Sequence, residues 1–368
     1  MNIKNNRWMI YGASGYSGRL IALEARKRGY KPLLAGRDGE KLRVISNKLN
    51  LPFRVFDLES EVEEIHHQLQ DIQLLLNCAG PFSQTSQPLI EACLEAKCNY
   101  LDITGEINVF EALHQRHQQA YQEDIVICPG VGFDVIPTDA VATVLKNELP
   151  DATHLSLSFS APGSISPGTA KTGIEGLKEK TKIRKNGQLI SVPAAKRRRE
   201  IPFADKRRKA SLIGLADVAT AYYSTGIPNI DTWLPMPTQA HIQLKASNYV
   251  RAVLKMTAVQ SRLKNKAASS LKGPNKAQRD KFSSQIWGEV RNKDGESVQA
   301  ILTTCNAYKL TIHGALGIVE YVLNNHKHIE GGYYTPTQLV GPGYISTLPG
   351  CSQIQLLPEA LQLKTAIL

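Results

Sequence analysis

Three glycines close to the N-terminus have the spacing of a phosphate-binding loop. They lie in YGASGYSG (residues 11–18), after the apolar run Trp8-Met9-Ile10 and before a segment expected to be helical over residues 18–28. Between a strand and a helix, such glycines allow a tight turn, close approach of the backbone to a pyrophosphate, and close packing of the helix. The helix N-terminus supplies N–H groups to the phosphate oxygens. A dinucleotide site is therefore predicted at Gly12, Ala13, Ser14, Gly15, Tyr16, Ser17 and Gly18.

The residue that ends the second predicted strand indicates which dinucleotide is bound. Arg37 stands at the end of LLAGR, where NAD-binding folds usually carry an acid for the ribose 2′-hydroxyl. A guanidinium instead suits a 2′-phosphate, through charge-assisted and bidentate hydrogen bonds. We therefore expect NADP(H) rather than NAD(H). Asp57, at the end of the third predicted strand, either meets the adenine edge or only caps the next turn.

A loop of small residues follows the fourth predicted strand. The sequence NCAGPF would leave space there for the ribose and nicotinamide of the cofactor, although an ordinary turn would look the same. The cofactor site is expected to include Asn77, Cys78, Ala79, Gly80 and Pro81.

The first 130 residues alternate short apolar runs with amphipathic stretches, which is typical of a parallel sheet joined by right-handed helical crossovers. The strands are predicted at residues 8–11, 32–35, 53–56, 72–77, 99–102 and 124–128. The fold class expected is therefore α/β, with an N-terminal doubly wound parallel (Rossmann) sheet.

After Gly130 the pattern changes to alternating apolar and polar residues, typical of half-exposed antiparallel strands. Such strands are predicted at residues 155–160, 241–244, 289–291 and 299–302, and one long helix at residues 307–324. A second α+β domain on a mixed or antiparallel sheet is expected. The chain is thus divided into an NADP-binding Rossmann domain (1–135), a substrate and dimerisation domain (136–306), and a C-terminal helix and tail that pack back on the first domain (307–368).

Charge is distributed unevenly along the chain. Residues 1–150 carry 15 Lys and Arg against 19 Asp and Glu, whereas the whole chain has 44 against 33 and a formal net charge of +11. The densest basic run is KRRREIPFADKRRK, Lys196–Lys209, which we expect to face outward. It is either a solvated loop or a docking site for an acidic carrier protein or an anionic lipid surface. Nucleic acid is the least favoured partner, because no nucleic-acid motif accompanies the run.

The six cysteines form no C-x-x-C pair, so neither a zinc site nor a disulfide framework is predicted. No apolar segment is long enough to span a membrane, and the N-terminus has no secretory pattern. We expect a cytoplasmic protein, with membrane association left open.

Motifs along residues 8–340 resemble the saccharopine dehydrogenase-like oxidoreductases, and more narrowly their trans-acting enoyl reductase branch. The stretches that carry the resemblance are YGASGYSGRL, LLAGRDGEKL, NCAGPFSQTSQPLIEAC, NYLDITGE, PGVGFDVIPTDAVA, SPGTAKTGIEGL, ATAYYSTGIPNI and GGYYTPTQL. The resemblance implies an NADP-binding Rossmann domain followed by a mixed-sheet domain. It also implies reduction of a double bond in a carrier-linked acyl substrate, or of an amino-acid imine in the saccharopine branch. The dense basic run and the tail beyond Pro342 depart from the family pattern.

The sequence assigns no catalytic residue. No Y-x-x-x-K occurs, so the proton-relay pair of short-chain dehydrogenases is absent. Asp134, in GFDVIPTD, either caps the next helix or lies in the cleft beside the nicotinamide. Tyr222, Tyr223 and Thr225 are either hydrogen-bond donors to a substrate carbonyl or interface residues.

These features are compatible with three functions. The first is an NADPH-dependent reductase of a C=C bond in an acyl or lipid-like substrate. The second is a saccharopine-type amino-acid dehydrogenase, which would need arginines pointing into the cleft to bind substrate carboxylates. The third is a non-catalytic NADP-binding protein. A homodimer is compatible with each.

Overall fold

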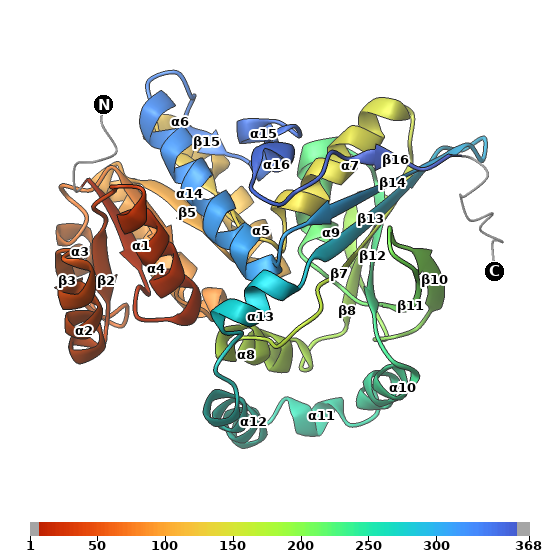
Figure 1. Ribbon diagram of the computed structural model, residues 1–368, viewed down its shortest axis with the longest axis horizontal. Coiled ribbons are helices and arrows are strands. Elements are labelled where there is room, and N and C mark those ends of the chain that lie inside the picture. Colours follow the sequence, from red (N-terminus) through yellow and green to blue (C-terminus); the bar gives the residue numbers. More distant parts are fainter. Residues whose placement is uncertain (1–6, 359–368) are drawn as a thin grey trace.

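The computed structural model describes residues 7–358, which form two sheets joined by helices (Figure 1). All seven strands of the first sheet are parallel, in the order β15-β6-β5-β4-β1-β2-β3. They are β1 (Trp8–Tyr11), β2 (Leu33–Gly36), β3 (Phe53–Val55), β4 (Leu74–Asn77), β5 (Asn99–Asp102), β6 (Val126–Cys128) and β15 (Gly332–Tyr333). The predicted Rossmann sheet is confirmed, because the order reverses between β4 and β1.

Helices between these strands pack on the sheet through apolar faces, as the sequence periodicity predicts. In α1 the buried positions are Gly18, Ile21, Ala22 and Ala25, which recur at helical spacing. In chain order, the helices of this region are α1 (Tyr16–Lys27), α2 (Gly39–Leu49), α3 (Val62–His67), α4 (Phe82–Ala96), α5 (Ile107–His114) and α6 (His117–Gln122).

The second sheet is mixed, which confirms the α+β expectation. Its main path is β10-β11-β12-β7-β13-β14-β16, with a β8–β9 hairpin joined to β12. β12 and β7 are parallel, and the other pairs are antiparallel. The strands are β7 (His154–Ser160), β8 (Thr181–Lys185), β9 (Gln188–Val192), β10 (Arg198–Pro202), β11 (Arg207–Leu212), β12 (Asn229–Pro235), β13 (Ser284–Arg291), β14 (Ser297–Thr304) and β16 (Gln355–Leu356).

One predicted strand of this region is wrong. Residues 241–244 lie within helix α10 (Thr238–Ser247), which has no buried residue, and Ile242 is 60% exposed. The alternation of apolar and polar residues at 241–244 therefore does not correspond to the two faces of a strand. The helices of the second region are α7 (Ile136–Glu148), α8 (Pro167–Gly176), α9 (Asp217–Thr225), α10, α11 (Arg251–Leu254), α12 (Thr257–Ser270) and α13 (Lys276–Lys281).

The C-terminal part of the chain returns to the first sheet. Helix α14 (Ala307–Asn325) crosses between the two sheets in Figure 1 and packs against α1. Strand β15 then pairs with β6, and α15 (Pro336–Val340), α16 (Tyr344–Thr347) and β16 come after it. Among residues 7–358, no helix is both long and apolar enough to cross a bilayer.

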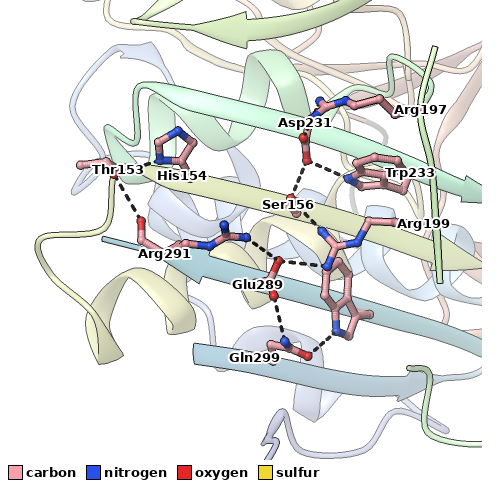
Figure 2. A network of polar contacts seen from close by, with 11 residues as sticks. Thr153, His154, Ser156, Arg197, Arg199, Asp231, Trp233, Glu289, Arg291 and Gln299 are labelled. Atoms are coloured by element: carbon pink, nitrogen blue, oxygen red, sulfur yellow. Dashed lines mark hydrogen bonds and ion pairs between the residues drawn. The ribbon is translucent and has the colours of Figure 1, made fainter. Parts of the chain in front are cut away.

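The basic run Lys196–Lys209 folds as the β10–β11 hairpin, and the expectation that it faces outward is wrong for Arg199 (Figure 2). Arg197 pairs with Asp231 at 3.0 Å, and Arg199 pairs with Glu289 at 3.1 Å. Arg199 lies within β10, and its side chain is 13% exposed on the face of the sheet where Glu289 lies. Arg197 precedes the strand, and its side chain is 49% exposed. Lys196, Lys206, Arg207 and Lys209 are exposed as well.

Candidate active site

Two glycines of the loop, Gly12 and Gly18, lie in positions where no side chain fits. Gly12 has φ +77°, and a Cβ there would lie 2.8 Å from the Cβ of Ala79. A Cβ on Gly18 would lie 2.4 Å from the carbonyl oxygen of Gly12. The N–H groups of Gly12 and Ala13 both donate to the Ala35 carbonyl, which holds the loop on β2. The backbone is thus shaped as a cradle that only glycine permits, and it fits a dinucleotide pyrophosphate.

Helix α1 begins beside this loop without a side-chain cap. Gly15 is its N-cap residue and provides no capping hydrogen bond. The first N–H groups of a helix have no intrahelical partner, so this end can bind an anion. Residues Gly12 to Gly18 would therefore hold the pyrophosphate; their cofactor contacts remain predictions.

Tyr16, the first residue of α1, ties the loop to the second region of the chain. Its hydroxyl donates to the Pro274 carbonyl at 2.6 Å and accepts from Arg279 at 3.1 Å. Gly273, with φ +73°, allows this contact, since a Cβ there would lie 2.5 Å from the Tyr16 ring. The ring of Tyr308 meets Tyr16 edge-on at 5.0 Å between centroids.

Arg37 and Asp57 lie near the carboxyl ends of β2 and β3. Arg37 is exposed and makes no hydrogen bond or ion pair within the described chain, so its guanidinium is available to a 2′-phosphate. Asp57 accepts the N–H groups of Leu58 at 2.7 Å and Glu59 at 3.2 Å through one carboxylate oxygen. Asp57 therefore caps its turn, and an additional contact with the adenine edge remains a prediction.

The loop after β4 is shaped by the side chain of Asn77. This side chain accepts from the Ala79 N–H at 2.9 Å and donates to Thr85 and Tyr100. It is fully buried, so Asn77 positions the loop through internal bonds. Cys78 and Ala79 are half-buried, whereas Gly80 is exposed and precedes a cis peptide bond to Pro81.

A polar network under this loop was not predicted from the sequence. Tyr100 donates to Asp102 at 2.9 Å, and Asp102 also accepts the N–H groups of Thr104 and Gly130. Burial raises the pKa of Asp102 to about 6. Glu106 binds the first two N–H groups of α4, at 2.8 and 2.9 Å. The motif NYLDITGE contains four of these residues, Tyr100, Asp102, Thr104 and Glu106, but its spacing indicates no such roles.

Aromatic and polar contacts join the second region of the chain to the loop after β6 and to α14. Phe159, at the carboxyl end of β7, meets Phe133 edge-on at 5.2 Å between ring centroids. Thr311 of α14 accepts the Phe133 N–H at 3.1 Å, and Tyr308 accepts the Ser166 N–H at 2.6 Å. The first turns of α14 therefore connect the glycine loop, the loop after β6 and the start of α8.

The structure assigns Tyr222, Tyr223 and Thr225 to packing between the two regions. The Tyr223 ring stacks on His114 at 3.8 Å, and the guanidinium of Arg184 lies 4.2 Å from the centre of the Tyr222 ring. The Thr225 hydroxyl donates to the Ala221 carbonyl within α9. The interface reading of these residues is thus the one that the geometry supports.

Asp134 does not cap helix α7. The N-cap position is Val135, with no side-chain hydrogen bond, and the Thr138 hydroxyl donates to the Val135 carbonyl instead. The Asp134 carboxylate lies against Gly105, where an added Cβ would be 3.0 Å from Oδ2. One carboxylate thus lies between the loops that follow β5 and β6.

This geometry agrees with a comparison against protein families. Residues 8–128 match the saccharopine dehydrogenase NADP-binding domain, from the start of β1 to the end of β6. This segment therefore resembles the NADP-binding domain of saccharopine dehydrogenases. The predicted cofactor, NADP(H), and the predicted family resemblance are both confirmed.

Curated relatives resemble this chain over part of its length. The saccharopine dehydrogenase-like oxidoreductase of Homo sapiens is 28% identical, over 48% of this chain and 47% of its own length. The trans-acting enoyl reductase of Mycobacterium ulcerans is 32% identical, over 36% of this chain and 33% of its own length. The chain thus spans about half or less of the length of these relatives.

The arrangement of both sheets also occurs in a solved structure. Apo saccharopine dehydrogenase (L-Glu forming) from Saccharomyces cerevisiae matches with a TM-score of 0.61 at 10% identity, over 96% of this chain and 100% of that one. At this identity the match establishes the fold alone: the NADP-binding domain is followed by the same kind of mixed-sheet domain.

Proposed function

We propose that the protein is an NADPH-dependent oxidoreductase that reduces a C=C bond in an acyl or lipid-like substrate. When bound, NADPH supplies a hydride. The residues that would hold it are those of the glycine loop, Arg37 and the Asn77–Pro81 loop. The relative named as a trans-acting enoyl reductase supports the choice of an enoyl substrate.

The observation that carries this choice is where the arginines of the basic run lie. Phe159 lies on the face of the second sheet that packs against α7, in edge-on contact with Phe133. Arg199 and its partner Glu289 lie on the opposite face, since Glu289 is paired in register with Ser156 and side chains alternate along β7. Arg198 lies on the same face as Phe159 by register, but its guanidinium donates to Thr238 and to the Met236 carbonyl. The run therefore offers no unbound arginine to a substrate carboxylate on that face. The aromatic pair of Phe133 and Phe159 suits an acyl chain better than a dicarboxylic amino acid.

Turnover with defined substrates tests the proposal. NADPH oxidation would be followed at 340 nm with a series of enoyl thioesters, and in parallel with 2-keto acids plus amino acids. Turnover with enoyl thioesters alone is expected. Turnover with the keto acid and amine pairs would instead identify an amino-acid dehydrogenase. If neither class is reduced while NADPH still binds, the protein is a non-catalytic NADP-binding protein.

We further propose that the exposed basic side chains of the β10–β11 hairpin dock an acidic acyl carrier. Lys206 and Arg207 are exposed and pair with no carboxylate within residues 7–358. The double variant Lys206→Glu/Arg207→Glu should weaken binding of an acidic carrier protein. The control is Lys31→Glu/Lys48→Glu, which places the same charge change on the first domain. Equal carrier binding by both variants would show that the exposed basic residues of the hairpin are only solvated. A loss of binding to anionic vesicles in the hairpin variant alone would identify a lipid partner.

A further inference from the structure

Asp134 lies where the nicotinamide half of a dinucleotide binds in a doubly wound sheet. The strand order reverses between β4 and β1, and Arg37 lies on the β2 side of that point. Asp134 follows β6, on the other side of the switch point, and its carboxylate touches Gly105 in the loop after β5. The two halves of the cofactor extend in these two directions from the pyrophosphate. Asp134 is therefore next to the reacting end of the cleft.

The carboxylate of Asp134 has no structural task that explains it. An acid just before a helix usually caps the first N–H groups, but Asp134 does not. Across residues 7–358 it accepts no hydrogen bond and joins no ion pair. Its own backbone is fixed on both sides, because Phe133 bonds Thr311 and Val135 bonds Gly132. The side chain is thus held in place by its neighbours while its oxygens stay free.

The surroundings of Asp134 combine access to water with poor solvation. The residue is exposed, yet the protein around it raises its pKa to about 6 by desolvation. The titratable group that interacts with it is Asp217 of α9, a buried acid whose pKa burial raises to about 7. No cation contributes to the pKa shift of Asp134.

We propose that Asp134 is the general acid of the reduction. This inference rests on the proposed function. The substrate double bond gains the hydride at one atom, and the adjacent atom gains a proton from the Asp134 carboxyl group as its O–H bond breaks. The carboxylate left behind takes a proton from water, which reaches it because the side chain is exposed. The net reaction consumes NADPH and one proton and yields the saturated product and NADP⁺.

The first test needs no substrate. The ¹³C resonance of the Asp134 carboxyl would be titrated in the complex with NADPH and in the complex with NADP⁺. A positively charged pyridinium beside the carboxylate should lower its pKa by about half a unit or more relative to NADPH. Equal pKa values in the two complexes would overturn the placement beside the nicotinamide, and so would a titration near 4 in the free protein.

The second test uses Asp134→Asn, which keeps the shape of the side chain and removes the acid. With the substrate found in the panel, kcat should fall by about 10²-fold or more, while Kd for NADPH stays within about twofold. The wild-type rate should fall as pH rises through the pKa of Asp134, and this dependence should vanish in the variant. Asp294→Asn, an exposed acid in the β13–β14 turn, is the matched control and should behave as wild type.

The outcomes separate the two proposals. If Asp134→Asn keeps kcat within about threefold and melts normally, Asp134 is not the acid, although the reductase assignment stands. If wild type reduces no substrate but the Asp134 pKa still differs between NADPH and NADP⁺, the substrate assignment fails and the position of the acid stands.

Discussion

The guanidinium of Arg199 lies 3.1 Å from the carboxylate of Glu289, which is 2% exposed at the centre of the second sheet (Figure 2). Glu289 also accepts a hydrogen bond from Gln299 and pairs with Arg291 at 3.5 Å. Removing one partner of a buried pair leaves an uncompensated charge. We expect Arg199→Met to lower the free energy of unfolding by about 2–3 kcal/mol, since Arg291 still compensates Glu289 in part.

Thermal and urea unfolding of Arg199→Met and Arg207→Met measure this effect. Arg207 is exposed on the same hairpin, so its replacement should change stability by less than about 0.5 kcal/mol. Equal losses in the two variants would show that the Arg199 pair contributes nothing beyond the loss of a surface arginine.

Replacing Arg37 should change the choice between cofactors. Without its guanidinium, Arg37→Ala should bind NADPH about ten- to a hundredfold more weakly and NADH about as well as wild type. Fluorescence titration with both cofactors measures the ratio. Arg43→Ala, which removes an arginine of α2 that pairs with Glu40, is the control and should leave both affinities unchanged. An unaltered NADPH-to-NADH ratio in Arg37→Ala would place the 2′-phosphate elsewhere.

Gly18 should tolerate no side chain. In Gly18→Ala the new Cβ would meet the Gly12 carbonyl oxygen at 2.4 Å, so the helix must move away from the loop that shapes the pyrophosphate site. We expect both a lower melting temperature and a loss of NADPH binding. Gly173→Ala in α8 is the matched control, because nothing lies within 4 Å of its Cβ and alanine favours a helix by up to about 1 kcal/mol. Normal NADPH binding by Gly18→Ala would contradict the cradle.

Asp217 should make stability fall as pH rises. Its carboxyl is fully buried on α9, and burial raises its pKa from 3.8 to about 7. Between these values the unfolded chain ionises while the folded chain keeps the proton, so the free energy of unfolding drops and then levels off above pH 7. Asp217→Asn cannot ionise and escapes this loss, which is on the order of a few kcal/mol.

Melting curves of wild type and Asp217→Asn at pH 4 and pH 8 provide the measurement. The melting temperature of the variant relative to wild type should be higher at pH 8 than at pH 4. The exposed Asp294→Asn should show no such trend. A difference that is independent of pH would mean that Asp217 is already charged in the folded protein at pH 4.

The sequence predicts what local pattern controls and misses what distant contacts control. Gly12, Arg37 and the small loop after β4 stand next to strand ends, and strand ends are visible as breaks in apolar runs. The inward turn of Arg199 depends on Glu289, which is 90 residues away, so no local pattern announces it. The sequence also does not show that the Asp134 carboxylate makes no hydrogen bond to the residues that the structure describes. An acid just before a helix has the same local sequence whether it caps the helix or leaves its carboxylate without a partner.

The seventh strand of the first sheet is the pair Gly332–Tyr333, which lies beside β6 although some two hundred residues separate them in the chain. During synthesis β6 therefore leaves the ribosome long before β15, the strand that pairs with its outer edge, has been made. Until residue 333 emerges, the nascent sheet exposes β6, and exposed edges recruit foreign strands. A fragment ending at Cys128 keeps every predicted cofactor residue and lacks this cover, so we expect it to aggregate where the full chain does not.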